Sequence, residues 1–396
     1  MDQTNNVEVA DIFRRYGDEY RRIHQSEMPL HQLRVMRAIE ICRTRELGGH
    51  VEQCDRCGRI RISYNSCRNR HCPKCQFLKK EQWVLEITRY LLPIQYFHVV
   101  FSIPDLLNPL VLRNKKAMYD ILFQSSAQTL KELSEDPKYL GARIGFISIL
   151  HTWGQNLMDH PHVHCIVTGG GLSADCTQWV SCKKNFLLPV KVISARFRKK
   201  FLTNLKKSHS ANELKFPATI EYLKEKPHFQ QLIDNLFAKE WVVYCKPSFK
   251  QTKYVVEYLS KYTHRVAIGN HRIIKVENDK VFFRYKDYAC KSKMKIMTVD
   301  AFEFIRRFLL HVLPDHFVKI RYYGLLAQRN RKDLLEECNV RLGVPPEERN
   351  ATEIPSDWHE LYLMVTGEEL TRCPFCGEGT MIIKEEIPAQ WYIRPP

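Results

Sequence analysis

Apolar side chains recur at helical spacing in two stretches near the beginning of the chain, residues 7–24 and 30–46. Steps of three and four residues place these side chains on one face, so each stretch predicts an amphipathic helix. Pro29 suits the first turn of the second helix, where a missing backbone N–H costs nothing. A third helix is expected over residues 77–92, because Pro93 cannot continue it.

Three runs of β-branched and aromatic residues predict buried strands at 96–104, 142–153 and 160–171. A helical pattern over residues 111–134 separates the first run from the second. Only the short loop GQNLMDH joins the second run to the third. These two strands are therefore expected to pair as an antiparallel hairpin.

A second group of strands is expected late in the chain. Residues 271–299 predict a hairpin followed by another strand, with the turn at 277–280. Asp300 stands where its side chain can cap the helix that follows. The whole pattern predicts an α+β fold with a central antiparallel sheet and flanking helices.

The composition supports a globular chain. With 396 residues and 44% hydrophobic side chains, it can bury a core and form two or three domains. It contains no run of about 18 apolar residues, and the first residues, MDQTNNVEVADIFRRY, do not resemble a signal peptide. We therefore expect neither membrane insertion nor secretion, and a cytoplasmic location.

The charge balance favours a nucleic acid partner. Lys and Arg number 61 against 44 Asp and Glu, a formal net charge of +17. The segment 183–207 has no acidic residue, although a solvated basic helix face would look the same. An excess over the whole chain is harder to explain in that way, and a phosphate backbone is its natural counterpart.

Cysteine spacing predicts zinc in the N-terminal region. Fourteen cysteines in a long chain with cytosolic character favour metal binding over disulfides. Two CxxC pairs separated by fourteen residues provide the thiolates of a tetrahedral site: Cys54, Cys57, Cys72 and Cys75. A second set of four candidate ligands is interleaved with the first, which leaves one or two zinc ions open: Cys42, His50, Cys67 and His71.

Another CxxC pair, Cys373 and Cys376, lies near the end of the chain without a second pair beside it. It is either half of a metal site, completed by Cys338, His359 or another chain, or two free thiols in a turn.

The predicted strand 160–171 carries a second candidate metal site. Side chains alternate along a strand, so His160, His162 and His164 point to one face. Imidazoles fixed at this spacing can share one divalent ion, whereas a single histidine is more often an ordinary hydrogen-bonded residue. The hairpin loop would bring the residues around Trp153 and Gln155 close to them.

Tyr254, Tyr258 and Tyr262 recur every four residues and so share one face of a predicted helix. Taken alone they would be an aromatic core stripe, but cationic residues lie among them, including Lys261 and Arg265. A phenol can attack a phosphodiester when a metal and nearby cations stabilise the transition state. The strand with the histidines and the helix with the tyrosines together predict a DNA strand-transfer reaction.

The chain resembles the HUH endonucleases, named for histidine, hydrophobe, histidine, and among them the two-tyrosine rolling-circle transposases of the IS91 family. Four motifs in the family's order carry the resemblance: YNSCRNRHCPKCQ, HTWGQNLMDHPHVHCIVTGGGL, EYLSKYTHRVAI and FIRRFLLHVLPDHFVKIRYYGLLAQR.

The resemblance implies an HUH nuclease fold and assigns roles to matching residues. His162 and His164 look like metal ligands for Mg²⁺ or Mn²⁺, and Tyr258 and Tyr262 like the nucleophile pair. Lys261 is similar to a lysine that lies near the scissile phosphate. Gln155 is the first choice for the third metal ligand, His160 the alternative and Asp159 a distant third.

The activity implied is cleavage and rejoining of single-stranded DNA at the element's ends through a 5′-phosphotyrosine. A plasmid or phage replication initiator would use the same chemistry, and a non-catalytic zinc-containing DNA-binding regulator is the alternative from another class. No GxxxxGK[ST] loop is present, so host helicase or replication proteins would unwind the DNA. Expected DNA contacts are Arg265, Arg284, Lys286 and Arg321.

Three segments follow from this reading. Residues 1–92 are expected to form a helical and zinc-binding DNA-recognition domain, and residues 93–300 an HUH tyrosine nuclease domain. Residues 301–396 would be a basic C-terminal region with the CxxC pair. The resemblance further implies a bacterial, nucleoid-associated protein. The sequence does not fix the oligomeric state.

Overall fold

The structure is a computed structural model that describes residues 7–249, 255, 267–287, 290–349 and 354–390. Its centre is an antiparallel sheet in the order β11-β4-β5-β3-β7, with the short β6 paired to β5. The strands are β3 (Tyr96–Ser102), β4 (Arg143–Trp153), β5 (Asp159–Leu172), β6 (Trp179–Ser181), β7 (Val243–Phe249) and β11 (Ile320–Gly324).

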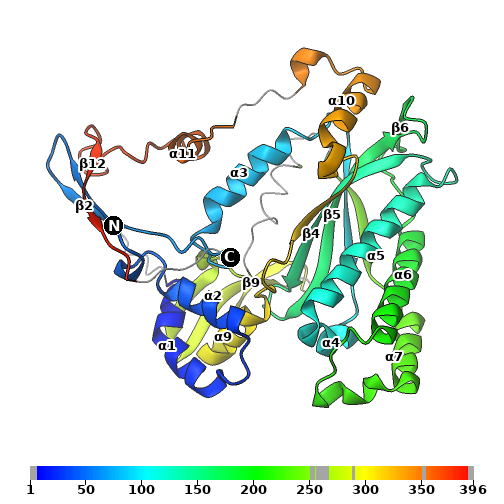
Figure 1. Cartoon of the computed structure of the whole chain (residues 1–396), viewed down its shortest axis with the longest axis horizontal. Coiled ribbons are helices and arrows are strands. Elements are labelled where there is room, and N and C mark those ends of the chain that lie inside the picture. Colours follow the sequence, from blue (N-terminus) through cyan, green and yellow to red (C-terminus); the bar gives the residue numbers. More distant parts are fainter. Residues whose placement is uncertain (1–6, 250–254, 256–266, 288–289, 350–353, 391–396) are drawn as a thin grey trace.

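One face of this sheet is covered by helices of the central part of the chain. Side chains that point to this face include Phe101, Phe146 and Val163, and they pack in one core with apolar residues of the covering helices. These helices are α4 (Asn108–Arg113), α5 (Lys115–Glu135), α6 (Val190–Ser210) and α7 (Lys226–Ala238). Figure 1 shows α5 and α6 lying along the sheet.

The opposite face carries a smaller apolar cluster. Alternation along the strands brings Ile149 of β4 and Ile166 of β5 to this face, where they pack with Val255. The cluster also includes residues of α3 (Gln76–Thr88) and α10 (Arg331–Arg341). This cluster leaves room on the same face for the histidines of β4 and β5.

A second core joins the beginning of the chain to a late segment. Helices α1 (Val9–His24) and α2 (Leu30–Glu40) pack with α9 (Ala301–Leu310), and Phe13 of α1 meets Phe308 of α9 edge to face at 5.2 Å. The small sheet β10-β9-β8 closes this core; its strands are β8 (Ile273–Glu277), β9 (Lys280–Asp287) and β10 (Lys293–Asp300). The Asp300 side chain accepts from the backbone N–H of Phe302 and so caps α9.

A third sheet joins the two ends of the chain. Its order is β12-β1-β2, formed by β1 (Gly49–Cys54), β2 (Ile60–Tyr64) and β12 (Met381–Ile387), and all its pairs are antiparallel. In Figure 1 the red β12 lies beside the blue N-terminal strands. Helix α11 (Trp358–Thr366) precedes β12, and short 3₁₀ helices lie at Arg45–Leu47, Asp105–Leu107, Ala218–Lys224, Asn270–Arg272, Gln328–Asn330 and Pro346–Glu348.

These observations confirm the α+β class and the antiparallel hairpin of β4 and β5. The expected division into residues 1–92, 93–300 and 301–396 stays a prediction, and the structure shows contacts between these segments. Helix α9 packs on α1, β11 belongs to the central sheet, and β12 pairs with β1, so residues 301–396 are spread over all three sheets or their cores. The apolar face of α9 is covered by α1 and α2, and the strands β11 and β12 are completed by backbone pairing with the distant strands β4 and β1.

The glycine triplet 169–171 lies inside β5 rather than in a turn. A Cβ on Gly169 would lie 2.6 Å from the Gln95 carbonyl, and one on Gly171 would lie 2.3 Å from the Arg143 carbonyl. Glycine therefore allows the neighbouring backbones to approach here.

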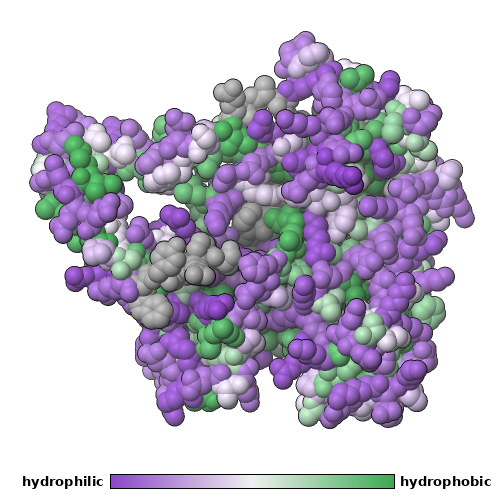
Figure 2. Space-filling view, in the orientation of Figure 1, coloured by the Kyte–Doolittle hydropathy of each residue, from purple (hydrophilic) through white to green (hydrophobic). Residues whose placement is uncertain are grey.

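The surface in Figure 2 is mainly hydrophilic, with small apolar patches. Among the described residues, no helix is both long and apolar enough to cross a lipid bilayer.

Candidate functional site

Three histidines come together on the face of the central sheet that carries the smaller apolar cluster. His151 on β4 lies opposite His162 on β5 in the hairpin register, and His164 follows two residues later on the same face. The candidate ligand nitrogens of these three side chains lie within 4.8 Å of one another. The group is therefore small enough to share one ion.

Neighbouring groups fix the ring orientations. His98 on β3 is hydrogen-bonded through Nε2 to Nδ1 of His164 at 2.8 Å, and Nδ1 of His162 lies 2.6 Å from the carbonyl oxygen of His160. With Nδ1 engaged in both cases, His162 and His164 can bind a metal only through Nε2. This arrangement, in which a second contact sets the tautomer of a ligating histidine, is common in metal sites.

Burial keeps the imidazoles neutral. It lowers the pKa of His162 to about 4 and that of His98 to about 4, and it lowers the pKa of His164 well below the ordinary value. Neutral imidazoles have the lone pair that a metal ion requires. At neutral pH the group is therefore ready to bind a cation.

The turn between β4 and β5 is held from three sides. Arg272 donates to the carbonyl of Gln155 at 2.7 Å, Arg307 donates to the carbonyl of Asn156 at 3.0 Å, and Nε2 of His311 lies 3.0 Å from the carbonyl of Leu157. Leu157 has a φ of 62° and a fully buried side chain. The turn is therefore anchored in the core of α1 and α9, which stabilises the hairpin that carries the histidines.

The third member of the histidine group differs from the expected one. His151 supplies it, whereas Gln155 lies in the turn and its backbone carbonyl accepts from Arg272. His160 points near Asp105, with Nδ1 3.6 Å from a carboxylate oxygen, and Asp159 lies with Lys115 on the other side. His151, which is paired with His162 in the hairpin register, thus joins the group, and Gln155 stays a predicted ligand.

The predicted tyrosine segment falls outside the described residues, and so do Tyr258, Lys261, Tyr262 and Arg265. Two residues of this part of the chain are described. Val255 is fully buried in the cluster on the histidine face of the sheet, and Ala267 is buried in the core of α1 and α9.

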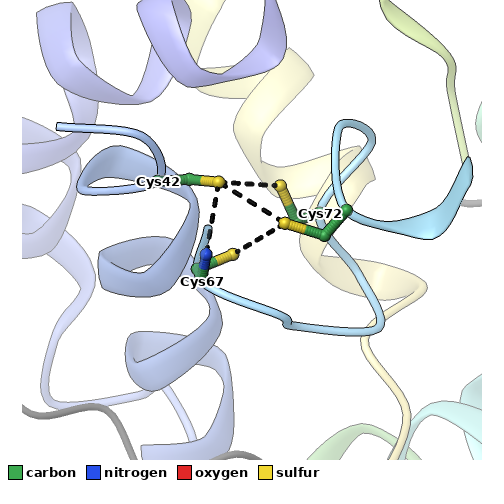
Figure 3. Close-up of side chains that lie close together, drawn as sticks. Cys42, Cys67 and Cys72 are labelled. Atoms are coloured by element: carbon green, nitrogen blue, oxygen red, sulfur yellow. Dashed lines mark hydrogen bonds between the residues drawn. The ribbon is translucent and has the colours of Figure 1, made fainter. Parts of the chain in front are cut away.

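Four cysteines form a compact group beneath α1 and α2. The Sγ atoms of Cys42 and Cys75 lie 3.5 Å apart, those of Cys67 and Cys75 3.6 Å apart, and those of Cys72 and Cys42 3.7 Å apart. The backbone N–H of Cys67 donates to Sγ of Cys42 (Figure 3). Four sulfurs within 4.8 Å of one another are the donor set of a structural zinc site.

A second group of four cysteines joins both ends of the chain. Sγ of Cys54 lies 3.8 Å from that of Cys376, and Sγ of Cys57 lies 3.7 Å from that of Cys373. One sulfur of each CxxC pair accepts a backbone hydrogen bond. The N–H of Cys57 donates to Sγ of Cys54, and the N–H of Gly379 donates to Sγ of Cys376, both at 3.4 Å. The pairing of β1 with β12 holds the two CxxC turns together.

The expected quartet of two N-terminal CxxC pairs is therefore divided. Cys72 and Cys75 join Cys42 and Cys67, while Cys54 and Cys57 join the C-terminal pair. The reason is the small sheet, in which β12 brings Cys373 and Cys376 to the end of β1. Sequence spacing identified the thiols but not their partners.

Comparison with known proteins agrees with this geometry. Residues 12–103 match a family described as "Transposase zinc-binding domain", and residues 145–333 match one described as "Putative transposase". The chain is 49% identical over 378 residues to "Putative transposase y4qJ" of Sinorhizobium fredii, covering 96% of this chain and 95% of that protein. The chain belongs to the IS91 family of transposases.

A more distant relative supports the same family. The "Transposase for insertion sequence element IS801" of Pseudomonas savastanoi pv. phaseolicola is 28% identical over 291 residues, 73% of this IS91-family chain and 68% of that protein. No solved structure matches the chain. The C-terminal cysteine pair of this transposase lies outside both matched family regions.

Four other candidate ligands of the transposase lie elsewhere. His50 pairs with Glu52 at 3.2 Å, and His71 lines a cavity beside α3. Cys338 is buried in the apolar cluster with Val255, and the His359 ring is tilted against that of Trp358, with the ring centres 3.7 Å apart. Their positions place them outside both cysteine groups.

The expected DNA contacts of the transposase fall into two kinds. Arg284 and Lys286 project from the exposed face of β9, next to the exposed Met294 and Ile296 of β10. Arg321 instead pairs with Asp120 and lies 4.1 Å from the centre of the Phe123 ring. Its described contacts are thus with the protein's own core.

Proposed function

We propose that this transposase nicks and rejoins single-stranded DNA at the ends of its element by a rolling-circle reaction. The observation that carries the proposal is the histidine group, which lies on the sheet face where Val255 is buried. Val255 precedes Tyr258 by three residues, so its burial on this face supports the assignment of the tyrosine segment to the histidine site.

The donor set fits a divalent transition metal. His151, His162 and His164 would hold it, and a bound cation would withdraw charge from a phosphate oxygen. Mg²⁺ prefers oxygen ligands in an octahedral arrangement, whereas imidazole nitrogens suit first-row transition metals. Three nitrogens without a carboxylate therefore favour Mn²⁺ over Mg²⁺.

The covalent chemistry would be carried by Tyr258 and Tyr262, which the resemblance assigns as the nucleophile pair. The phenol gives up its proton as its oxygen attacks phosphorus, the bond to the 3′ oxygen breaks, and that oxygen takes up one proton in exchange to become a 3′ hydroxyl. The 5′ phosphate remains esterified to tyrosine, so rejoining needs no nucleotide hydrolysis. Lys261 and Arg265 would stabilise the charge on the phosphate.

The zinc module would read the element's ends. We assign a zinc ion to each cysteine group, one at Cys42, Cys67, Cys72 and Cys75, the other shared by the two ends of the chain. The recognition domain would thus extend beyond residues 1–92 to include β12. Host helicase or replication proteins would supply the single strand.

A covalent-adduct assay tests the proposed reaction. Labelled single-stranded oligonucleotides from the element's ends are incubated with the full chain and Mn²⁺ or Mg²⁺, and adducts are separated under denaturing conditions and mapped by mass spectrometry. We expect an adduct on Tyr258 or Tyr262, more of it with Mn²⁺, and none in the double variant Tyr258→Phe, Tyr262→Phe or in His162→Ala. An undiminished adduct in the double variant would remove the tyrosine assignment.

A further inference from the structure

A cavity of about 410 Å³ lies between α3, the end of α9 and the strands β4 and β11. Its volume is in the range of small-molecule pockets, about 300–1,000 Å³. Residues from three separate parts of the fold line it, among them Arg70, Trp83, Trp153, Lys319 and Tyr322. None of the sites described above uses it.

Cations are concentrated in this cavity. Arg70 is fixed there because its guanidinium donates to the carbonyls of Phe317 and Pro314, each at 2.7 Å. Burial, with the neighbouring charge of Arg70, lowers the pKa of Lys319 to about 7. Lys79 stands at the exposed edge. An anionic group beside Arg70 and Lys319 would favour the charged form of Lys319, which burial disfavours, so the cavity suits an anionic ligand.

Rigid aromatic rings form the walls. Trp83 donates from Nε1 to the Tyr322 hydroxyl at 2.7 Å, which fixes both side chains. The Lys319 ammonium lies 5.1 Å from the centre of the Trp153 ring. Flat aromatic surfaces beside cations are the usual means of binding a single-stranded nucleotide, whose base stacks while its phosphate pairs.

The cavity adjoins the histidine group. Trp153 lines the cavity and stacks on His151, with the ring centres 4.9 Å apart and the planes 17° apart. A strand that passes a phosphate over the histidines could therefore place a neighbouring nucleotide in the cavity.

We propose that this cavity binds one nucleotide of the single-stranded DNA, with its base against the aromatic walls and its phosphate beside Lys319 and Arg70. This inference rests on the proposed function, because it assumes a single strand at the histidines. The cavity, which lies where the zinc module meets the central sheet, would hold the strand beside the cleaved bond.

Two variants test the cavity without removing core residues. Val318→Trp fills the opening from a residue that is 59% exposed, and Val340→Trp on α10, at 50% exposure, is its control. Lys319→Met removes the charge but keeps the length, and Lys226→Met, at an exposed position outside the basic segment 183–207, is its control. Zinc content and thermal unfolding show whether each variant is folded.

Binding is measured by fluorescence anisotropy with no added divalent metal. The probes are a labelled 20-nucleotide random-sequence single strand and a sugar-phosphate strand of equal length without bases. We expect Val318→Trp to weaken binding of the first probe roughly tenfold, with a much smaller effect on the second. Lys319→Met should weaken both and reduce the salt dependence by about one phosphate contact.

Unchanged affinity in both variants, or equal losses for the two probes in Val318→Trp, would overturn the proposal. The proposal would also be overturned if free dAMP bound in the cavity and the single strand did not displace it, because the cavity would then be a mononucleotide site. The adduct assay separates the two hypotheses. If the protein forms the adduct but Val318→Trp and Lys319→Met bind the strand normally, the cavity proposal alone is wrong. If these variants lose binding as expected but the protein forms no adduct, the cleavage proposal alone is wrong.

Discussion

At the scale of single residues, the orientation of the candidate metal-binding histidines depends on the side chains that contact them from behind. His98 lies on β3, its ring is stacked parallel to that of His164 at 5.0 Å, and its Nε2 meets Nδ1 of His164. If His164 binds metal through Nε2, it must carry its proton on Nδ1, and His98 must accept that proton's hydrogen bond. The tautomer of one residue thus sets that of the next.

The first prediction concerns this contact. We expect His98→Leu to weaken Mn²⁺ binding about 10–100-fold, because ligating imidazoles lose orientation when their second contact is removed. Isothermal titration calorimetry of the zinc-loaded protein measures the affinity. His160→Leu is the matched control, since His160 lies outside the group of three and is expected to change the affinity little. Equal effects of the two substitutions would contradict the positioning role of His98.

A second residue-scale prediction concerns a buried carboxylate. Asp159 is 8% exposed, and within the described part of the chain neither carboxylate oxygen has a hydrogen-bond partner. Burial raises the pKa of Asp159 from 3.8 to about 7, although Lys115 opposes the shift. The folded protein therefore keeps a proton that the unfolded chain loses between about pH 4 and 7.

The free energy of unfolding should accordingly fall as the pH rises through this window and level off above it. The expected loss is on the order of a few kcal/mol, since one pKa unit corresponds to about 1.4 kcal/mol. Asp159→Asn should remove this component, so that the difference between variant and wild type grows from pH 4 to 7. Urea unfolding at several pH values measures it, and parallel curves for the two proteins would contradict it.

At the scale of elements, local patterns predicted the strands β3, β4 and β5 of the central sheet but not β6, β7 and β11, and they did not predict the full metal groups. The runs that became β3, β4 and β5 are rich in β-branched and aromatic residues, which fit a buried sheet, and alternation along β5 placed His162 and His164 on one face. His151 was missed although it faces His162 across the hairpin, because a lone histidine in an apolar run has no pattern of its own.

The cysteine partners could not be deduced for a different reason. Cys57 and Cys373 are 316 residues apart, and nothing in either CxxC turn specifies its partner. Their meeting depends on the pairing of β1 with β12, a non-local contact whose register is set by the whole small sheet. Spacing therefore identifies a zinc turn but leaves its second half open.

The third prediction follows from this sheet. The purified chain should bind two zinc ions, and Cys373→Ser with Cys376→Ser should bind one, as measured by plasma mass spectrometry. Loss of the bridging ion should also increase hydrogen exchange in β12, because little else connects this strand to the body of the protein than its pairing with β1. Cys290→Ser, an exposed thiol outside both groups, should retain two ions. Two ions in the double variant would rule out the bridging site.

At the scale of the whole molecule, Arg272 connects the basic hairpin to the histidine hairpin. It donates to the carbonyl of Arg284 on β9 at 2.8 Å and to that of Gln155 in the β4–β5 turn at 2.7 Å. The exposed face of β9 and β10 therefore has a fixed position relative to the histidines. A strand of DNA lying on that face would be guided toward the proposed cleavage site, and the net charge of +17 would favour its approach.

The last prediction tests this path with residues that look alike in sequence. Arg284→Ala and Lys286→Ala should each weaken single-stranded DNA binding and reduce the slope of log affinity against log salt by about 0.7, the value for one phosphate contact on a single strand. Arg321→Ala should leave the slope unchanged and lower the melting temperature instead, because Arg321 pairs with Asp120 and packs on Phe123. Anisotropy at several salt concentrations and thermal unfolding distinguish the two effects. A reduced slope for Arg321→Ala, with normal slopes for the β9 variants, would place the DNA on the opposite side of the central sheet.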